Sequence, residues 1–405
     1  MDVTTFYEGL LGIDAPWRVK EVRMDVPGRR VEVELECRER TVWGDPQAGR
    51  LHIHSWELRR WRHRDSCGFT TELVAEVPRV KYPDGTTQMV AVPWADRYAR
   101  WTRQFELFAI LVLQGARSVK EGCELLGISW DLGQRIMAHA VERGLERRSL
   151  EGIRYLGIDE KSFRRGSDFV TVLNQLSPEA CVLEVTEGRS QESGDAAFAR
   201  LSPEQRAGVE AVAMDFAAGY RASTEKNLPL AEVVHDRFHA SQLLSQAVDE
   251  VRRAEHRQRC AEGDEVLTGS RYLFLKGFEK LEPEDRESLE ALLRRDLKVG
   301  RAWTLKEQFR HFWTRRGMPA ALDCFEAWYG RAIRSRLKPV KRAARTFQKH
   351  LFGMLNYYAH PITNAASEGL NSRIQALKAN ARGFRSFENY RVSILFHLGK
   401  LDMSL

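Results

Sequence analysis

The 405-residue sequence lacks the marks of secreted, membrane-spanning and disulfide-linked proteins. Its six cysteines are scattered and form no CxxC pair, so we expect a reducing compartment and no disulfide framework. The longest strongly apolar stretch, residues 105–113, is too short to span a bilayer. Residues 1–17 carry an early Asp and no long apolar run, which is not the pattern of a signal peptide. These absences predict a cytoplasmic protein with no membrane partner.

Internal repeats and low-complexity tracts are also missing, and what remains is the composition of a globular protein. Hydrophobic residues make up 43% of the chain and charged residues 29%, which is ordinary for soluble domains. The length predicts roughly two to four domains. The net charge of +7 points weakly to a polyanionic partner, because Lys and Arg that neutralise phosphates release counterions. Basic residues gather at 59–64 and 331–349, although such runs are usually solvated faces.

Local patterns divide the chain into parts of different character. The first part has period-two alternation, as in residues 31–35, and is predicted to be a β-rich module. The second has Ser118 and Ser129 as N-cap candidates for two helices around a tight turn, which predicts a helix-turn-helix, with a plain helical hairpin as the alternative. A mixed sheet covered by helices, an all-helical stretch and two further helices follow. The predicted parts are 1–95, 96–150, 151–240, 241–350 and 351–405.

Three acids stand where chemistry gathers in α/β proteins. Asp159 and Asp215 each close an apolar strand, and Glu368 lies at the start of a late helix. Any one Asp after a strand is most often a turn or a helix cap, so the order of all three carries the prediction. Ligand chemistry collects beyond the carboxyl ends of such strands, and Mg²⁺ prefers oxygen ligands. Two such ions can stabilise both the attacking and the leaving oxygen in a phosphoryl transfer.

Several motifs together resemble the DDE transposases of bacterial insertion sequences, of the ISL-three type. The resemblance runs through essentially the whole chain, and its segments Asp-Arg-Phe-His and Ser-Glu-Gly-Leu-Asn are specific when taken together. The motifs are Ile-Asp-Glu-Lys at 158–161, Ala-Met-Asp at 213–215, Val-His-Asp-Arg-Phe-His at 234–239, Asn-Ala-Ala-Ser-Glu-Gly-Leu-Asn-Ser-Arg-Ile at 364–374 and Arg-Gly-Phe at 382–384.

This resemblance implies a multi-domain α/β protein with an RNase H-like catalytic fold and a helical insertion before its Glu. Asp159, Asp215 and Glu368 would be catalytic and would hold two Mg²⁺ ions, for which Mn²⁺ can substitute. Asp236 and His239 match the family's Asp-x-x-His signature and would support the site rather than bind metal. The remaining supporting residues would be the two asparagines that flank Glu368, namely Asn364 and Asn371.

The implied activity is binding of the terminal inverted repeats, followed by Mg²⁺-dependent DNA cleavage and strand transfer by at least a dimer. The partner is double-stranded DNA, so the protein is expected at the bacterial nucleoid. A DNA-binding regulator with an inactive core and an RNase H-like nuclease without strand transfer are the alternatives. The predicted DNA contacts are Ser129, Trp130, Gln134, Arg135, Arg59, Arg60 and Arg62. Trp303 and Trp313 could stack on an extruded base or simply pack in a core.

The N-terminal module departs from the family pattern. Relatives carry a zinc ribbon made from CxxC pairs, whereas Cys37 has no such partner and Tyr82 stands where a cysteine is expected. A structural zinc site normally needs four ligands, and this set is incomplete. We therefore expect a degenerate module without zinc that still touches DNA. The side chains that could have assisted Cys37 are His52, His54, His63 and Cys67.

Overall fold

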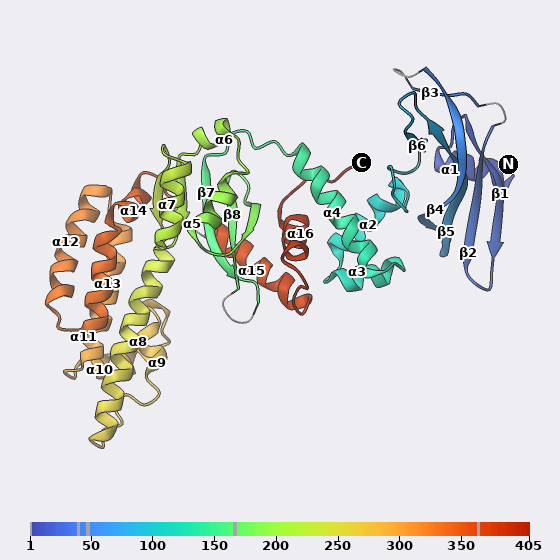
Figure 1. Cartoon of the computed structure of the whole chain (residues 1–405). Coiled ribbons are helices and arrows are strands. Elements are labelled where there is room, and N and C mark those ends of the chain that lie inside the picture. The colour runs from blue at the N-terminus through green and yellow to red at the C-terminus, as the bar shows by residue number, and fades with distance from the viewer. Residues whose placement is uncertain (1, 39–40, 46–48, 165–167, 363–364) are drawn as a thin grey trace. The chain divides into compact units, whose positions relative to one another are not determined.

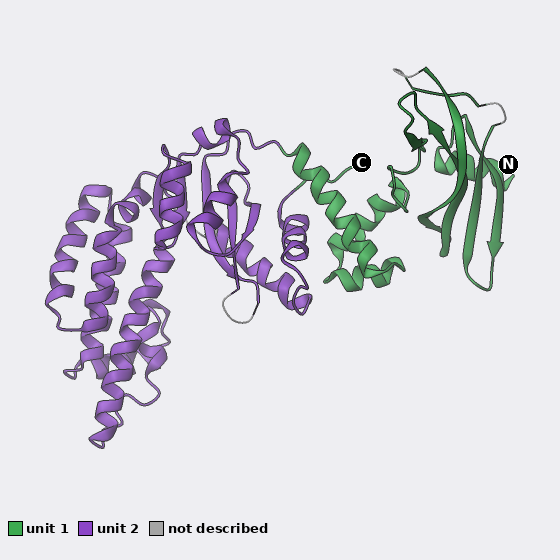
Figure 2. Cartoon of the chain, viewed as in Figure 1, with its two compact units in different colours: residues 1–148, 401–405 green, residues 149–400 purple. Residues whose placement is uncertain are grey.

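The protein has the multi-domain α/β fold that the sequence predicts. The structure, a computed structural model, divides into two compact units (Figure 2): residues 1–148 with 401–405, and residues 149–400. Among the described residues, no helix is both long and apolar enough to cross a membrane. The described residues are 2–38, 41–45, 49–164, 168–362 and 365–405.

The first unit begins with one helix and a mostly antiparallel sheet (Figure 1). Strand order is β1-β2-β5-β4-β3, with β6 pairing to β5, and β2 and β5 run parallel. Alternate residues of β2 enter the core, where Trp17, Trp61 and Trp94 meet edge to face. The period-two prediction is therefore confirmed for this strand. The elements are α1 (Val3–Leu11), β1 (Trp17–Asp25), β2 (Arg30–Cys37), β3 (Trp43–Asp45), β4 (Gly49–Ser66), β5 (Phe69–Lys81) and β6 (Thr87–Met89).

Three helices complete the first unit and include the predicted pair, a short helix and a longer second helix joined by a turn. Ser118 Oγ accepts from the amide of Glu121 at 3.2 Å, and Ser129 Oγ accepts from that of Leu132 at 3.3 Å. Both predicted N-caps are therefore confirmed. Gly127 lies between the helices with a φ of 62°, a left-handed conformation that glycine adopts without strain. The helices are α2 (Arg103–Gly115), α3 (Val119–Leu126) and α4 (Trp130–Arg147).

The second unit contains a five-stranded mixed sheet of order β11-β10-β7-β8-β9. β7, β8 and β9 form an antiparallel meander, and β10 and β11 run parallel to β7, as expected of an RNase H-like core. Leu156 and Ile158 share a core cluster with Phe198 of α5 and Tyr220 of α7. The strands are β7 (Tyr155–Ser162), β8 (Phe169–Ser177), β9 (Cys181–Glu187), β10 (Ala211–Met214) and β11 (Glu232–His235). The helices are α5 (Gln191–Phe198), α6 (Pro203–Ala207), α7 (Ala218–Asn227), α15 (Ala365–Asn380) and α16 (Phe387–Leu398).

An all-helical bundle separates β11 from α15, as the sequence predicts. Its core is rich in aromatic side chains, with Phe309 stacked on both Phe312 and Phe347. The helices are α8 (Arg237–Ala261), α9 (Arg271–Leu275), α10 (Pro283–Leu293), α11 (Lys298–Arg310), α12 (Met318–Arg334), α13 (Lys338–Lys349) and α14 (Leu351–Leu355). Short 3₁₀ turns lie at Phe278–Lys280, His311–Thr314 and Asn356–Tyr358.

Candidate active site

Strand register brings three acids to one level of the second sheet. Gly157 of β7 pairs with Ala213 of β10, and Ala213 pairs in turn with Val234 of β11. Two residues farther along the same register come Asp159, Asp215 and Asp236. Side chains two residues apart share a face, and neighbouring strands lie about 4.8 Å apart. The three acids therefore occupy adjacent positions.

Asp159 differs in one respect from its prediction, because it lies within β7 and not at its end. β7 continues to Ser162 because β8 pairs with it as far as Phe169. The Asp159 side chain is 9% exposed, and Lys161, two residues on along the strand, forms an ion pair with its Oδ2 at 3.3 Å. Sequence reasoning did not assign Lys161, although the period of two along a strand would have placed it on this face.

Helix α15 packs over the same face and supplies a direct contact to Asp159. Asn371 Nδ2 donates to Asp159 Oδ2 at 2.6 Å, so this asparagine orients the carboxylate. Ser367 lies over Gly157, where a Cβ would come within 2.6 Å of its Oγ. The glycine is what allows α15 to approach β7 this closely, and sequence reasoning had not identified it.

Asp215 directly follows β10, as predicted, and its surroundings raise its pKa. Burial is the main cause, and the negative charge of Asp159 adds to it. The amide of Ala217 donates to Asp215 Oδ1 at 2.8 Å. The backbone is fixed from behind by His235, whose Nδ1 lies 2.9 Å from the carbonyl oxygen of Asp215. Burial lowers the pKa of His235 to about 4, so the ring is neutral.

A second imidazole continues this contact into the helical bundle. His350, at the end of α13, has its Nδ1 3.1 Å from His235 Nε2. Phe216 packs against both rings, with centroid distances of 4.9 and 5.3 Å. The bundle is thereby tied to the loop that carries Asp215. No sequence motif singled out His350 or Phe216.

Asp236 and His239 lie at the acids, as their signature implied. Asp236 caps α8 by accepting from the amide of Phe238 at 3.1 Å, and its Oδ2 lies 3.6 Å from His239 Nδ1. The Asp236 carboxylate raises the pKa of His239, and the charges of Asp159 and Asp215 add to the effect. The imidazole is therefore close enough to all three acids for their charges to act on it.

Glu368 lies in the first turn of α15 and is half-buried. Glu368 directly follows Ser367, and Asn371 comes one helical turn later. Both Ser367 and Asn371 contact β7. Among the described residues, no three His, Cys, Asp or Glu side chains are arranged closely enough to hold a metal ion. The amide of Asn371 and the ammonium of Lys161 occupy the Asp159 oxygen instead. Asn364 lies outside the described residues.

The donor set nevertheless fits an oxygen-preferring divalent cation. Asp159 and Asp215 are neighbouring, largely buried carboxylates, and two such charges are costly unless a cation compensates them. The buried Oδ1 of Asn371 and Oδ2 of Asp236 have no hydrogen-bond partner among the described residues. Oxygen atoms therefore dominate this face, as Mg²⁺ requires.

The predicted DNA-contacting residues of α4 differ in their access to solvent. Arg135 is exposed on the second helix of the pair. Ser129 is exposed, but its hydroxyl caps the helix, and Trp130 is half-buried. Gln134 points into the helical core with 9% of its surface exposed, so it is not placed to read a base. Of the predicted DNA contacts on α4, Arg135 is the one whose side chain is exposed and has no part in capping or packing the helix.

The arginines of β4 are largely engaged within the protein. Arg62 forms an ion pair with Asp65, and its side chain is only 11% exposed. Arg60 is paired with acids on neighbouring strands, Glu32 of β2 and Glu72 of β5. Arg59 is half-buried and lies over the ring of Trp61. This basic run is therefore neutralised to a large extent by the sheet itself.

Trp303 and Trp313 are both buried in the aromatic core of the bundle. Trp303 meets Phe278 edge to face, and Trp313 meets Phe309 and Phe312 in the same way. Neither ring presents a face on which a base could stack. In this structure both tryptophans therefore pack in a core, which was the alternative to stacking on an extruded base.

The side chains that could have completed a zinc site do not converge. His52 and His63 lie eleven residues apart on β4, which corresponds to roughly 35 Å along a strand. Cys37 Sγ lies 3.0 Å from Thr41 Oγ1, and the buried His63 Nδ1 lies 2.8 Å from Thr102 Oγ1. The module is held by its apolar core, in which the three tryptophans take part.

A helix-turn-helix joined in one chain to a mixed sheet with clustered acids is the architecture of an enzyme that acts on DNA. Comparison with known proteins names the group: residues 156–394 match the ISL3-type DDE family described as transposase, and residues 90–141 match the helix-turn-helix domain of transposase family ISL3. The first match covers more than half of the chain. The chain belongs to the transposase family ISL3.

Curated relatives support the same family over almost the whole chain. The transposase for insertion sequence element IS1001 of Bordetella parapertussis is 24% identical, over 91% of this chain and 91% of that protein. The transposase for element IS1557 of Mycobacterium tuberculosis is 26% identical, over 94% and 92% respectively. The solved Drosophila P element transposase strand transfer complex covers 76% of this chain and 94% of that chain, with a TM-score of 0.45 and 9% identity. The protein is thus a DDE transposase with a DNA-binding domain, and membership of this family implies the use of a divalent metal.

Proposed function

We propose that this transposase binds the terminal inverted repeats of its own insertion sequence, cleaves there and joins the freed end to target DNA. The observation that carries the proposal is the shared level of Asp159, Asp215 and Asp236, with α15 packed over the same face. In this proposal the β-rich module and the helix-turn-helix recognise the ends, and the second unit performs the chemistry. The functional boundaries at 95/96, 150/151, 240/241 and 350/351 belong to the proposal.

Asp159, Asp215 and Glu368 would hold the divalent metal, for which we propose two Mg²⁺ ions. When bound, a pair of such ions stabilises the attacking and leaving oxygens of an in-line phosphoryl displacement. Asp159 and Asp215 are already neighbours, and Asn371 keeps one Asp159 oxygen oriented. Glu368 lies on the helix that Asn371 and Ser367 hold against β7, and in this proposal its carboxylate completes the set of metal ligands.

The remaining residues of the site position the reactants and protons. Lys161 supplies positive charge beside the acids, where the phosphate of the DNA must come to lie, and the carboxylate of Asp236 raises the pKa of the neighbouring His239. The carboxylates repel that phosphate, so cationic side chains at the rim help it to bind. His235 and Phe216 hold the loop of Asp215 from behind.

The proposed reaction has two displacements and no covalent enzyme intermediate. The oxygen of a water molecule attacks the scissile phosphorus, the P–O3′ bond breaks, and the strand is left with a 3′-OH and a 5′-phosphate. That 3′-OH then attacks a phosphorus of the target DNA, and the displaced 3′ oxygen of the target takes up the proton. Since two ends must be joined together, at least two copies of the protein act on one DNA complex.

A cleavage and joining assay on a labelled oligonucleotide from the end of the element tests this proposal. Wild type should nick at the end and join it to target with Mg²⁺ and do nothing in EDTA. Asp159→Asn, Asp215→Asn and Glu368→Gln should bind the DNA yet lose both steps. Glu225→Gln, an exposed acid on α7, is the matched control and should keep both.

Each alternative outcome has a definite meaning. If the three variants match wild type, the assignment of the acids is wrong. Cutting without joining would make the protein a nuclease, and specific binding without cutting would make it a regulator. Asp236→Asn separates two assignments within the site: a supporting role predicts reduced cleavage with Mg²⁺ dependence intact, whereas complete loss together with a shifted Mg²⁺ requirement would make Asp236 a metal ligand.

A further inference from the structure

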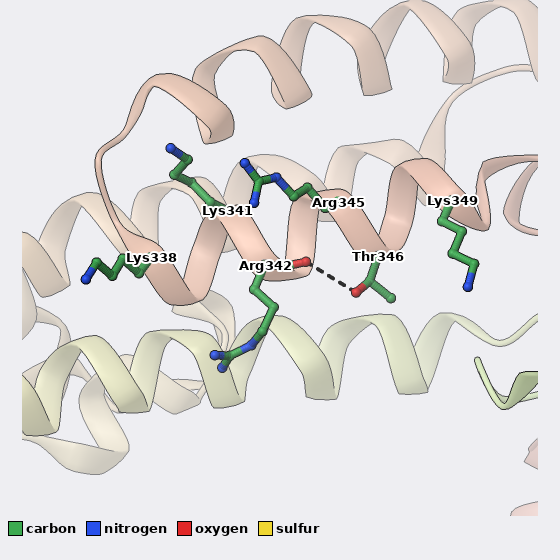
Figure 3. Close-up of a pocket in the computed structure, with 6 residues that line it drawn as sticks. All are labelled: Lys338, Lys341, Arg342, Arg345, Thr346 and Lys349. Carbon is green, nitrogen blue, oxygen red and sulfur yellow. Dashed lines mark hydrogen bonds between the residues drawn. The ribbon is translucent and has the colours of Figure 1, made fainter.

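Helix α13 carries a row of basic side chains for which the site described above has no use. Lys338, Lys341, Arg342, Arg345 and Lys349 recur every three or four residues and so follow one side of the helix (Figure 3). Together with Thr346 they line a shallow depression of about 530 Å³. We call these five basic residues the α13 stripe. The opposite side of the helix is buried in the aromatic core of the bundle.

Most of this positive charge is uncompensated. Arg342 points toward α8 and pairs there with Glu250 at 2.7 Å (Figure 3). Within the part of the chain that the structure describes, the other four members of the stripe make no ion pair with an acid. On β4, by contrast, the arginines are met by acids of the neighbouring strands. The stripe is therefore a surface of one sign, held rigidly by its apolar underside.

Helix stability does not explain the stripe. The first turn of α13 contains no acid and begins with Lys338, followed by Lys341. Positive charge at a helix N-terminus opposes the helix dipole, at a cost of about 0.3–1 kcal/mol for each charge. On α12, Arg331 and Arg334 stand in the last turn, where the dipole favours them. The dipole therefore opposes the two N-terminal members of the stripe, Lys338 and Lys341, and favours only Lys349 in the last turn.

The end of the stripe at Lys349 is connected to the loop that carries Asp215. Lys349 is followed by His350, which contacts His235, and His235 in turn contacts the carbonyl oxygen of Asp215. Two short polar contacts therefore connect the end of α13 to the loop of Asp215. The Lys349 end of the stripe is therefore fixed relative to the loop that carries Asp215.

We propose that the α13 stripe is a DNA-binding surface that holds the phosphate backbone of the duplex next to the cleaved bond, without reading its sequence. Lys and Arg on successive turns can neutralise successive phosphates, and they carry no base specificity when they do so. The proposal rests on the proposed function in one respect, namely that the DNA is processed at Asp215. It adds to the helix-turn-helix a second DNA contact, on a different unit of the chain.

The test compares the full-length protein with two quadruple variants. In the stripe variant, Lys338→Gln, Lys341→Gln, Arg345→Gln and Lys349→Gln are combined. In the matched control, Arg257→Gln, Arg294→Gln, Arg295→Gln and Arg301→Gln remove the same charge from exposed positions elsewhere on the bundle. The affinity for a random-sequence duplex and for an element-end duplex is measured by fluorescence anisotropy over a range of salt concentrations.

The stripe variant should bind both duplexes more weakly by a similar factor. The slope of log affinity against log salt should fall by about 3 to 4, because each lost phosphate contact removes about 0.9. The control should keep the wild-type slope. A third variant, Lys338→Arg, Lys341→Arg and Lys349→Arg, should also keep it, and equal melting temperatures for all four proteins exclude a folding defect.

The inference is overturned if the stripe variant keeps the wild-type slope, if the control loses as much, or if wild type binds neither duplex. A loss confined to the element-end duplex would overturn it too, because the stripe would then be reading sequence. Failure of the proposed function gives a different result. If the salt dependence of DNA binding requires the stripe but the protein never cuts or joins DNA, the proposed function is wrong and this inference still holds.

Discussion

Replacing His350 tests whether the helical bundle holds the loop of Asp215 in place. His235 Nδ1 lies 2.9 Å from a carbonyl oxygen, which can only accept, so this nitrogen carries the hydrogen. Nε2 of the same ring is then an acceptor, and His350 Nδ1, at 3.1 Å, must donate to it. Both rings are almost completely buried, so no water can replace the missing donor without a rearrangement.

The size of the effect follows from this geometry. His350→Leu leaves His235 Nε2 buried without a partner, which costs about 1–3 kcal/mol. Phe216, which follows Asp215 in the chain, also loses one of the three rings it packs against, namely His235, His350 and Phe347. His350→Asn retains an N–H donor near the same position, so it should lose less.

Two measurements are needed on each variant. Chemical unfolding at a pH well above the pKa of free imidazole gives the free energy of unfolding, and end cleavage with Mg²⁺ gives kcat. His350→Leu should lose about 1–3 kcal/mol of stability, and cleavage should fall by roughly two- to thirteenfold if half of that loss appears in the barrier. DNA affinity should stay unchanged, and His350→Asn should lie between this variant and wild type.

His397→Leu provides the matched control. This histidine is also largely buried in the second unit, where it has no hydrogen bond to a described residue, and burial lowers its pKa to about 4. Its replacement should leave cleavage intact. The reasoning is refuted if His350→Leu keeps wild-type stability and kcat, or if His397→Leu loses as much cleavage.

Three further predictions concern other contacts. Burial lowers the pKa of His63 from its ordinary 6.5 to about 4, so the first unit should lose up to about 3 kcal/mol of stability as the pH falls from 6.5 toward 4, and its stability should not depend on this group above pH 6.5. Thermal melts of His63→Gln should lack this pH dependence. An equal slope of stability against pH in both proteins would contradict the prediction. Arg391→Met removes a two-point contact at 2.7 and 2.9 Å from the buried Glu184, which keeps an ion pair with Arg200 at 3.3 Å, and should cost about 1.5–3 kcal/mol in urea unfolding. Glu184→Gln should restore part of that loss, and no recovery would argue against the buried charge of Glu184 as the cause. Ser129→Ala should cost about 1 kcal/mol of stability, because its hydroxyl caps α4. Arg135→Ala should lower DNA affinity in an anisotropy assay without changing the melting temperature. The reverse pattern would make Ser129 the DNA contact and Arg135 the residue that stabilises the helix.

The elements that could be predicted from the sequence are those set by neighbouring residues. Ser118 and Ser129 cap their helices as predicted, because an N-cap depends on a hydroxyl and an amide a few residues apart. The end of β10 before Asp215 was predictable for the same reason. The position of Asp159 within its strand was not, because it depends on how far β8, a separate segment, continues to pair with β7.

Register and partners are long-range properties, and they account for the other differences. That Asp236 stands level with Asp159 follows only from the order β11-β10-β7, which no local pattern records. The arginines of residues 59–62 read as a free basic run, yet acids that lie opposite in the sheet compensate part of it. Gln134 likewise lies on the buried side of α4, although its position near the start of the helix had suggested that it contacts DNA.

The helical bundle cannot be a detachable appendage of the catalytic sheet. His350 and Asn356 both follow α13, and they contact His235 and the carbonyl oxygen of Val233, at 3.1 and 3.0 Å respectively. Gly353 lies so close to the His235 ring that a Cβ there would come within 2.5 Å of it. The same helix that ends at these contacts carries the α13 stripe on its outer side, and a helix of this length is a stiff rod. The stripe is therefore held in a defined position relative to the loop that carries Asp215, so DNA bound along it would also have a defined position relative to that loop.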